Sequence, residues 1–92
     1  MFILVCFDIV DDKDRRQAVK IIGDYGYRVQ KSVFECSEIS EKQYLKMKAR
    51  LEDCIDSLWD TVRYYRVCSD CVRKIEYSGI GDLPQIKDFQ VV

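Results

Sequence analysis

The sequence predicts an α+β fold of the ferredoxin-like type, a βαββαβ sandwich with an extra C-terminal strand. Three observations support this. Strand and helix patterns follow one another in that order, the 92 residues suit a single domain with a thin core, and the first strand is apolar on both faces. We therefore expect one domain over residues 1–92, with its core in residues 1–78 and a loop and strand in residues 79–92.

The first strand and the first helix meet at an acidic turn. Residues 2–7 are apolar or aromatic and lead directly into Asp8. Asp11 or Asp12 can cap a helix over about residues 13–25, and Gly26 is expected to end it. The apolar stripe of this helix consists of Ala18, Val19, Ile22 and Tyr25.

The second helix has clear start signals. Ser40 and Gln43 have the spacing of a capping box, and Ile39 and Tyr44 have that of a hydrophobic staple. Before it, residues 27–36 read as two short strands with a bend at residues 30–32. The expected buried stripe is Tyr44, Met47, Leu51, Cys54, Ile55 and Leu58, and the expected solvent face carries Lys42, Lys46, Lys48 and Arg50.

Residues 61–67 form the next expected strand. The C-x-x-C pair Cys68 and Cys71 is expected in a turn, followed by a short strand near residues 74–77 and a last strand over residues 85–92. One C-x-x-C supplies half of a tetrahedral zinc site, so a zinc ion would need the same pair from a second chain. The other three cysteines fall at apolar positions and read as core residues.

The first strand also predicts a homodimer packed sheet face to sheet face. Successive side chains of a strand point to opposite faces, so Leu4 and Cys6 lie on one face, and Ile3 and Val5 on the other. Two helices cover only one face, and a second copy of the chain can cover the other. Asp8 then approaches its own symmetry mate, and the segment 85–92 can add to the edge of the partner's sheet.

Composition excludes several functions. The chain contains 15 Lys and Arg against 16 Asp and Glu, with a net charge of −1, so nucleic-acid binding would need local basic patches or metal ions. Histidine is absent, which excludes a Ser-His-Asp triad and histidine-based RNase chemistry. Five cysteines without a signal peptide or an apolar run of membrane-spanning length favour the cytoplasm.

Asp8 is the strongest candidate functional residue. A carboxylate at the mouth of a hydrophobic strand is costly to desolvate without a metal ion, an arginine or a partner beside it. The alternative is that Asp8 simply begins a loop. Because the chain has no histidine, any phosphodiester hydrolysis would use a metal ion to activate water, and Asp8 is its candidate ligand.

The run FILVCFDIVDDKDRRQAVKIIGDYGYRVQKSVFE, with its Y-G-x-R-V-Q-x-S-V-F-E string, resembles the first half of the CRISPR-associated protein two family. The run VRYYRVCSDCVRKIEYSG is similar to the family's second half. The resemblance implies a ferredoxin-like homodimer in spacer acquisition that bridges the CRISPR integrase and binds duplex DNA. It also implies endonuclease activity on RNA or DNA, with Mg²⁺, or Mn²⁺ in its place, shared across the dimer.

The resemblance further assigns roles to individual residues. Asp8 corresponds to the catalytic, metal-binding acid, and Gln17 stands where some members have a second helix arginine. The nucleic-acid binding or supporting residues are Phe7, Arg15, Arg16, Arg28, Ser32 and Phe34. Arg15, Arg16 and Arg28 could equally be solvated charges, Phe34 could be a core residue, and Ser32 could serve the bend.

Three classes of function remain open from the sequence. The first is a structural adaptor that holds duplex DNA between integrase dimers. The second is a metal-dependent nuclease, including a toxin-like endoribonuclease, which requires Asp8. The third is a non-catalytic module that binds single-stranded RNA on its sheet, although the aromatic signature usual for such modules is absent.

Overall fold

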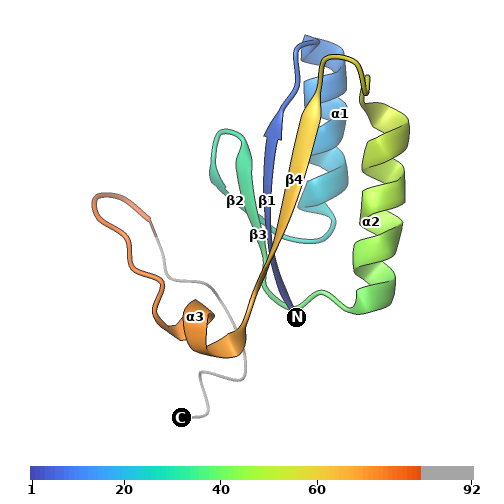
Figure 1. Ribbon diagram of the computed structural model, residues 1–92. Coiled ribbons are helices and arrows are strands. Elements are labelled where there is room, and N and C mark those ends of the chain that lie inside the picture. Colours follow the sequence, from blue (N-terminus) through green and yellow to red (C-terminus); the bar gives the residue numbers. More distant parts are fainter. Residues whose placement is uncertain (82–92) are drawn as a thin grey trace.

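A four-stranded antiparallel sheet carries two helices on one face (Figure 1). The computed structural model describes residues 1–81. In chain order the elements are β1 (Phe2–Asp8), α1 (Asp12–Gly23), β2 (Tyr27–Gln30), β3 (Val33–Cys36), α2 (Glu41–Cys54), β4 (Thr61–Val67) and α3 (Ser69–Arg73). The strand order is β2-β3-β1-β4, which confirms the predicted ferredoxin-like fold. Within residues 1–81 no helix has the length and apolarity needed to cross a membrane.

The core lies between the sheet and its two helices. From β1, Ile3, Val5 and Phe7 point into it, while Leu4 and Cys6 are only half-buried on the opposite side. We call this opposite side the open face. The helices add Ala18, Ile21, Ile22, Met47 and Leu51 to the core. The predicted division of β1 into two apolar faces is therefore confirmed.

Both helices begin at predicted caps. The Asp11 carboxylate accepts a hydrogen bond from the Asp14 N–H at 2.9 Å. Ser40 and Gln43 form the expected capping box, with reciprocal bonds of 2.9 and 3.1 Å. Such caps each stabilise a helix by about 1 kcal/mol, so the starts of α1 and α2 are fixed locally by sequence.

The first helix ends two residues before the predicted end at residue 25. Helix α1 ends at Gly23, with Asp24 as its C-cap. Gly26 is required for a different reason, because a Cβ there would lie 2.5 Å from the carbonyl oxygen of Glu35 and 2.7 Å from the Cys36 sulfur. Gly26 thus allows the chain entering β2 to approach β3 closely.

Two other predictions were also wrong. Leu58 is 81% exposed, because α2 ends at Cys54 and residues 55–60 form a turn outside its buried stripe. The expected short strand at 74–77 is absent from the described chain. After α3, residues 75–78, 80 and 81 instead line a cavity of about 490 Å³ with Leu4 of β1 and with the edge strand β2.

The C-x-x-C pair also differs from its expected turn. Cys68 is the N-cap of α3 and Cys71 lies within that helix. The expected last strand at 85–92 lies outside the described residues.

Candidate metal and nucleic-acid site

Asp8 is the last residue of β1 and is exposed on the open face. It pairs with Thr61 across the β1–β4 ladder. Within residues 1–81 its carboxylate makes no hydrogen bond or ion pair. Both oxygens are therefore available to a metal ion or to a group from another molecule.

The loop between β1 and α1 is held in place by Arg15. Its guanidinium donates to the carbonyl oxygens of Ile9 and Val10, each at 3.2 Å, and pairs with Asp12 at 2.7 Å. The guanidinium of Arg15 is therefore already bonded to the backbone that follows Asp8. Its geometry suits the positioning of the loop, and a phosphate contact would have to compete with these bonds.

Asp60 is a functional candidate that our sequence reasoning missed. It is only 7% exposed, and its two carboxylate oxygens accept from the N–H groups of Val10 and Asp56, each at 2.9 Å. The side chain therefore joins the loop after Asp8 to the turn before β4. Two aspartates four residues apart, directly before a strand, were the available signal for such a turn-stabilising carboxylate.

Arg28 stabilises the bend between β2 and β3. Its Nε and Nη2 atoms donate to the Lys31 carbonyl oxygen at 3.0 and 2.6 Å, and its guanidinium lies 6.0 Å from the centre of the Phe34 ring. The Ser32 carbonyl oxygen accepts from the Phe7 N–H at 3.1 Å. A hydrogen bond thus joins the β2–β3 bend to Phe7, the residue before Asp8 in β1.

Phe7 and Phe34 are buried, with their ring centres 6.3 Å apart. Both rings belong to the core beneath the site. Neither presents a free surface on which a nucleic-acid base could stack.

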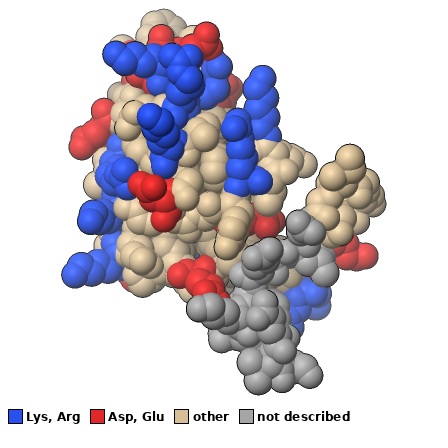
Figure 2. Space-filling view, turned by 180° about the vertical axis from the view of Figure 1, so that it is seen from behind, with Lys and Arg blue, Asp and Glu red and all other residues tan. Residues whose placement is uncertain are grey.

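Arg16 differs from the other two candidate arginines, because it is exposed and makes no hydrogen bond or ion pair within the described chain. Figure 2 shows mainly Lys and Arg among the charged side chains of the face behind the sheet. The exposed cations of α1 and α2 without a partner in residues 1–81 are Lys13, Arg16, Lys20, Lys42 and Lys46. These five side chains form the helical basic set.

The open face combines aromatic, apolar and charged groups. Leu4 pairs with Tyr65 on one side and with Glu35 on the other, and Glu35 pairs with Tyr27 on β2. Tyr27 and Tyr65 are 57% and 43% exposed. Burial of Glu35 raises the pKa of its carboxyl group above the ordinary value of 4.5. A partner that covered this face would bury the same carboxyl further.

A metal ion would find few ligands in one chain. Within residues 1–81 no cluster of three or more Asp, Glu or Cys side chains could hold one. Asp8 still suits Mg²⁺, which prefers oxygen ligands and keeps several of its waters when one or two carboxylates bind it. Residues 1–81 of one chain offer a single such carboxylate at this site, and two copies of the chain would supply two.

Together these features define a class: a small ferredoxin-like protein with an unengaged carboxylate at the end of its first strand, on the sheet face that its two helices leave uncovered. Residues 1–75 match the family described as CRISPR associated protein Cas2. This chain belongs to that family, which confirms the resemblance seen in the sequence.

Individual relatives and solved structures support membership of this family. The chain is 38% identical over 86 residues to the CRISPR-associated endoribonuclease Cas2 1 of Moorella thermoacetica, with 88% of each chain covered. The crystal structure of Streptococcus pyogenes Cas2 at pH 6.5 has a TM-score of 0.76 and 34% identity over 86% of this chain and 100% of that one. A chain of a partial Cas6-RT-Cas1–Cas2 complex has a TM-score of 0.72 and 27% identity, over 91% of this chain and 94% of that one.

Proposed function

We propose that this protein acts in the cytoplasm as a homodimer in CRISPR adaptation, where it bridges the CRISPR integrase and binds duplex DNA. The observation that carries this proposal is the open face, a sheet surface that the two helices leave uncovered and that ends in the unengaged Asp8. Membership of the Cas2 family and likeness to a chain of a complex named for Cas1 and Cas2 support the same function.

The open face has the composition of a protein interface. Tyr27, Val29 and Tyr65 are each more than 40% exposed on or beside it, around the half-buried Leu4 and Cys6. Tyrosines are enriched in interface cores because they bury a large apolar area and keep a polar tip. A specific dimer needs roughly 1,200–2,000 Å² of total buried area, and a sheet face with its neighbouring segment 75–81 can contribute to it.

Duplex DNA would contact the helical basic set. Its five cations are free to neutralise phosphates, whereas Arg15 and Arg28 already donate to backbone carbonyls. Phosphate contacts fix position without reading sequence. We therefore expect DNA binding that depends steeply on salt and weakly on sequence.

Matched variants test the dimer. Light scattering at micromolar concentration should give twice the chain mass for the natural protein. Tyr65→Arg places a charge on the open face and should yield monomers, whereas Leu45→Arg, at a 55% exposed position of α2, should remain dimeric. A monomeric natural protein, or a Tyr65→Arg variant that dimerises as tightly as Leu45→Arg, would contradict the proposed interface.

Mg²⁺-dependent endonuclease activity on RNA or DNA is a second candidate function, favoured by the unengaged carboxylate of Asp8. When bound, the metal ion would activate a water molecule and neutralise phosphate charge. In this chain Asp8 would hold the ion together with the partner's Asp8. Arg15 and Asp60 would hold the loop after Asp8 away from the two carboxylates. The phosphodiester would reach the ion between the open faces of the two copies.

A further inference from the structure

Cys68 and Cys71 differ from the other cysteines in their access to solvent. Both are exposed, whereas Cys6 and Cys54 are half-buried and Cys36 is buried. Burial raises the pKa of the Cys36 thiol to about 11. The Cys54 thiol donates to the Asp14 carbonyl oxygen at 3.3 Å. Cys68 and Cys71 are therefore the two thiols most open to reagents in solution.

The backbone holds these two residues in a single helical turn. Cys68 is the N-cap of α3, and its carbonyl oxygen accepts from the Val72 N–H at 2.9 Å. Val72 is 4% exposed and anchors this turn to the protein. Residues three apart in a helical turn have Cβ atoms roughly 5–6 Å apart, and a disulfide needs Cβ atoms about 3.5–4.5 Å apart. The turn therefore has to tighten by about 1–2 Å to join the sulfurs.

The two thiols are also unequal. The Cys68 side chain makes no cap hydrogen bond at the start of α3. The Cys71 N–H, followed by its thiol, lowers the pKa of Cys68, and the thiol contact raises the pKa of Cys71. Cys68 is thus the better nucleophile of the pair near neutral pH.

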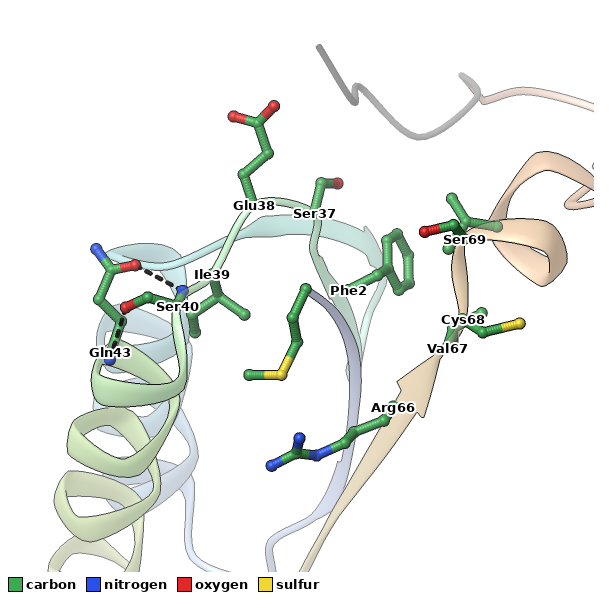
Figure 3. Close-up of a pocket in the computed structure, with 12 residues that line it drawn as sticks. Phe2, Ser37, Glu38, Ile39, Ser40, Gln43, Arg66, Val67, Cys68 and Ser69 are labelled. Carbon is green, nitrogen blue, oxygen red and sulfur yellow. Dashed lines mark hydrogen bonds between the residues drawn. The ribbon is translucent and has the colours of Figure 1, made fainter. Parts of the chain in front are cut away.

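The surroundings leave the Cys68 sulfur accessible. Figure 3 shows Cys68 at the end of β4, beside a cavity of about 850 Å³ that is also lined by Phe2, Val67 and Val72. Its sulfur points away from the Ser40 and Gln43 side of that cavity. A small reagent can therefore reach the sulfur from solvent.

We propose that Cys68 and Cys71 form a redox-active dithiol, which low-molecular-weight disulfides of the glutathione type convert reversibly into an intrachain disulfide. The Cys68 thiolate attacks one sulfur of oxidised glutathione, forms a mixed disulfide and releases one glutathione thiolate. Cys71 then loses its proton and attacks the Cys68 sulfur, which releases the second glutathione thiolate. The protein loses two electrons and two protons, and one disulfide molecule becomes two thiols.

A zinc site is a less suitable use of the same pair. Two thiolates supply half of the four ligands of a structural zinc site. No third ligand completes a cluster with them among residues 1–81. The dithiol needs no further residue, because both cysteines are exposed and lie in the same helical turn.

Mass spectrometry of the reduced full-length protein exposed to oxidised glutathione tests the proposal. The natural protein should lose about 2 Da per chain, and peptide mapping should place the disulfide between Cys68 and Cys71. Cys71→Ser should stop at the mixed disulfide on Cys68. Cys68→Ser should react at least about tenfold more slowly, because its remaining exposed thiol is the less acidic one. Cys54→Ser, a matched control on α2 outside the pair and the open face, should form the disulfide like the natural protein.

Several results would overturn the proposal. These are equal rates of mixed disulfide formation in the two single variants, stable glutathione adducts on the natural protein without closure, or closure between other cysteines. Stoichiometric binding of added Zn²⁺ that blocks oxidation would show a metal site instead. If either serine variant fails to fold, the mapped disulfide of the natural protein and the relative alkylation rates of Cys68 and Cys71 decide the question.

Discussion

Asp60→Ala tests how the loop after Asp8 is held. The natural carboxylate is 7% exposed and accepts two backbone hydrogen bonds, from Val10 and Asp56. Hydrogen bonds to a charged acceptor each contribute about 1.5–3 kcal/mol. Water can reach part of the exposed Val10 backbone after the substitution, so we expect a loss of about 2–3 kcal/mol. This is a large fraction of the roughly 5–15 kcal/mol that stabilises a typical domain.

Urea unfolding followed by circular dichroism measures this loss, at one fixed protein concentration because dimerisation makes stability concentration-dependent. Asp56→Ala is the matched control. That carboxylate is exposed and accepts only from the Leu58 N–H at 3.0 Å, so its removal should cost less than about 1 kcal/mol. If Asp60→Ala is no more destabilising than Asp56→Ala, Asp60 does not hold the loop.

Three further outcomes are expected. Burial raises the pKa of Glu35 above 4.5, so the loss of stability from ionising this carboxyl group is absent below pH 4.5 and grows as pH rises through the folded-state pKa. Glu35→Gln should therefore stabilise the protein at neutral pH, and the difference in stability from the natural protein should vanish under acid titration. Deletion of residues after Gly81 should weaken dimerisation, and unchanged dimer affinity would exclude strand exchange by that segment. Arg16→Glu should weaken DNA binding and reduce its salt dependence without loss of stability. Arg15→Glu should instead lower the free energy of unfolding by about 1–3 kcal/mol, because two backbone carbonyls lose their donor. The reverse pattern in gel retardation of DNA and in unfolding assays would contradict these assignments.

Local signals in the sequence predicted most of the sheet and both long helices. The capping box at Ser40 and the apolar run of β1 depend on neighbouring residues only, and the structure confirms both. The bounds of β4, residues 61–67, were also predicted in full. The fold class followed from the order of these elements.

Features set by distant contacts were not predictable in the same way. The apolar character of Leu58 suggested burial, but the turn held by Asp60 exposes it. Residues 74–77 have the composition of a strand, yet they form none, and residues 75–77 line a cavity with Leu4 and the edge strand β2. Arg15 was a candidate for phosphate binding, and its bonds to two carbonyls depend on the path of the preceding loop.

Cleavage by Asp8→Asn protein, compared with Asp11→Asn, is the most direct measurement of the proposed site. Both changes remove one carboxylate charge near the end of β1, and asparagine caps a helix about as well as aspartate. With RNA and duplex DNA as substrates, in Mg²⁺ and in chelator, Asp8→Asn should abolish any Mg²⁺-dependent cleavage. The dimer and the salt-sensitive DNA affinity should remain, and Asp11→Asn should cleave like the natural protein.

Retained cleavage by Asp8→Asn, in a preparation free of contaminating nuclease, would show that Asp8 is not the catalytic acid. If none of these proteins cleaves but all support spacer acquisition with the integrase, the adaptor function stands and Asp8 belongs to the dimer interface. The proposed metal site predicts that, if the natural protein cleaves, cleavage is lost in Asp8→Asn alone. Detectable cleavage at equal rates by the Asp8→Asn and Asp11→Asn proteins would contradict it.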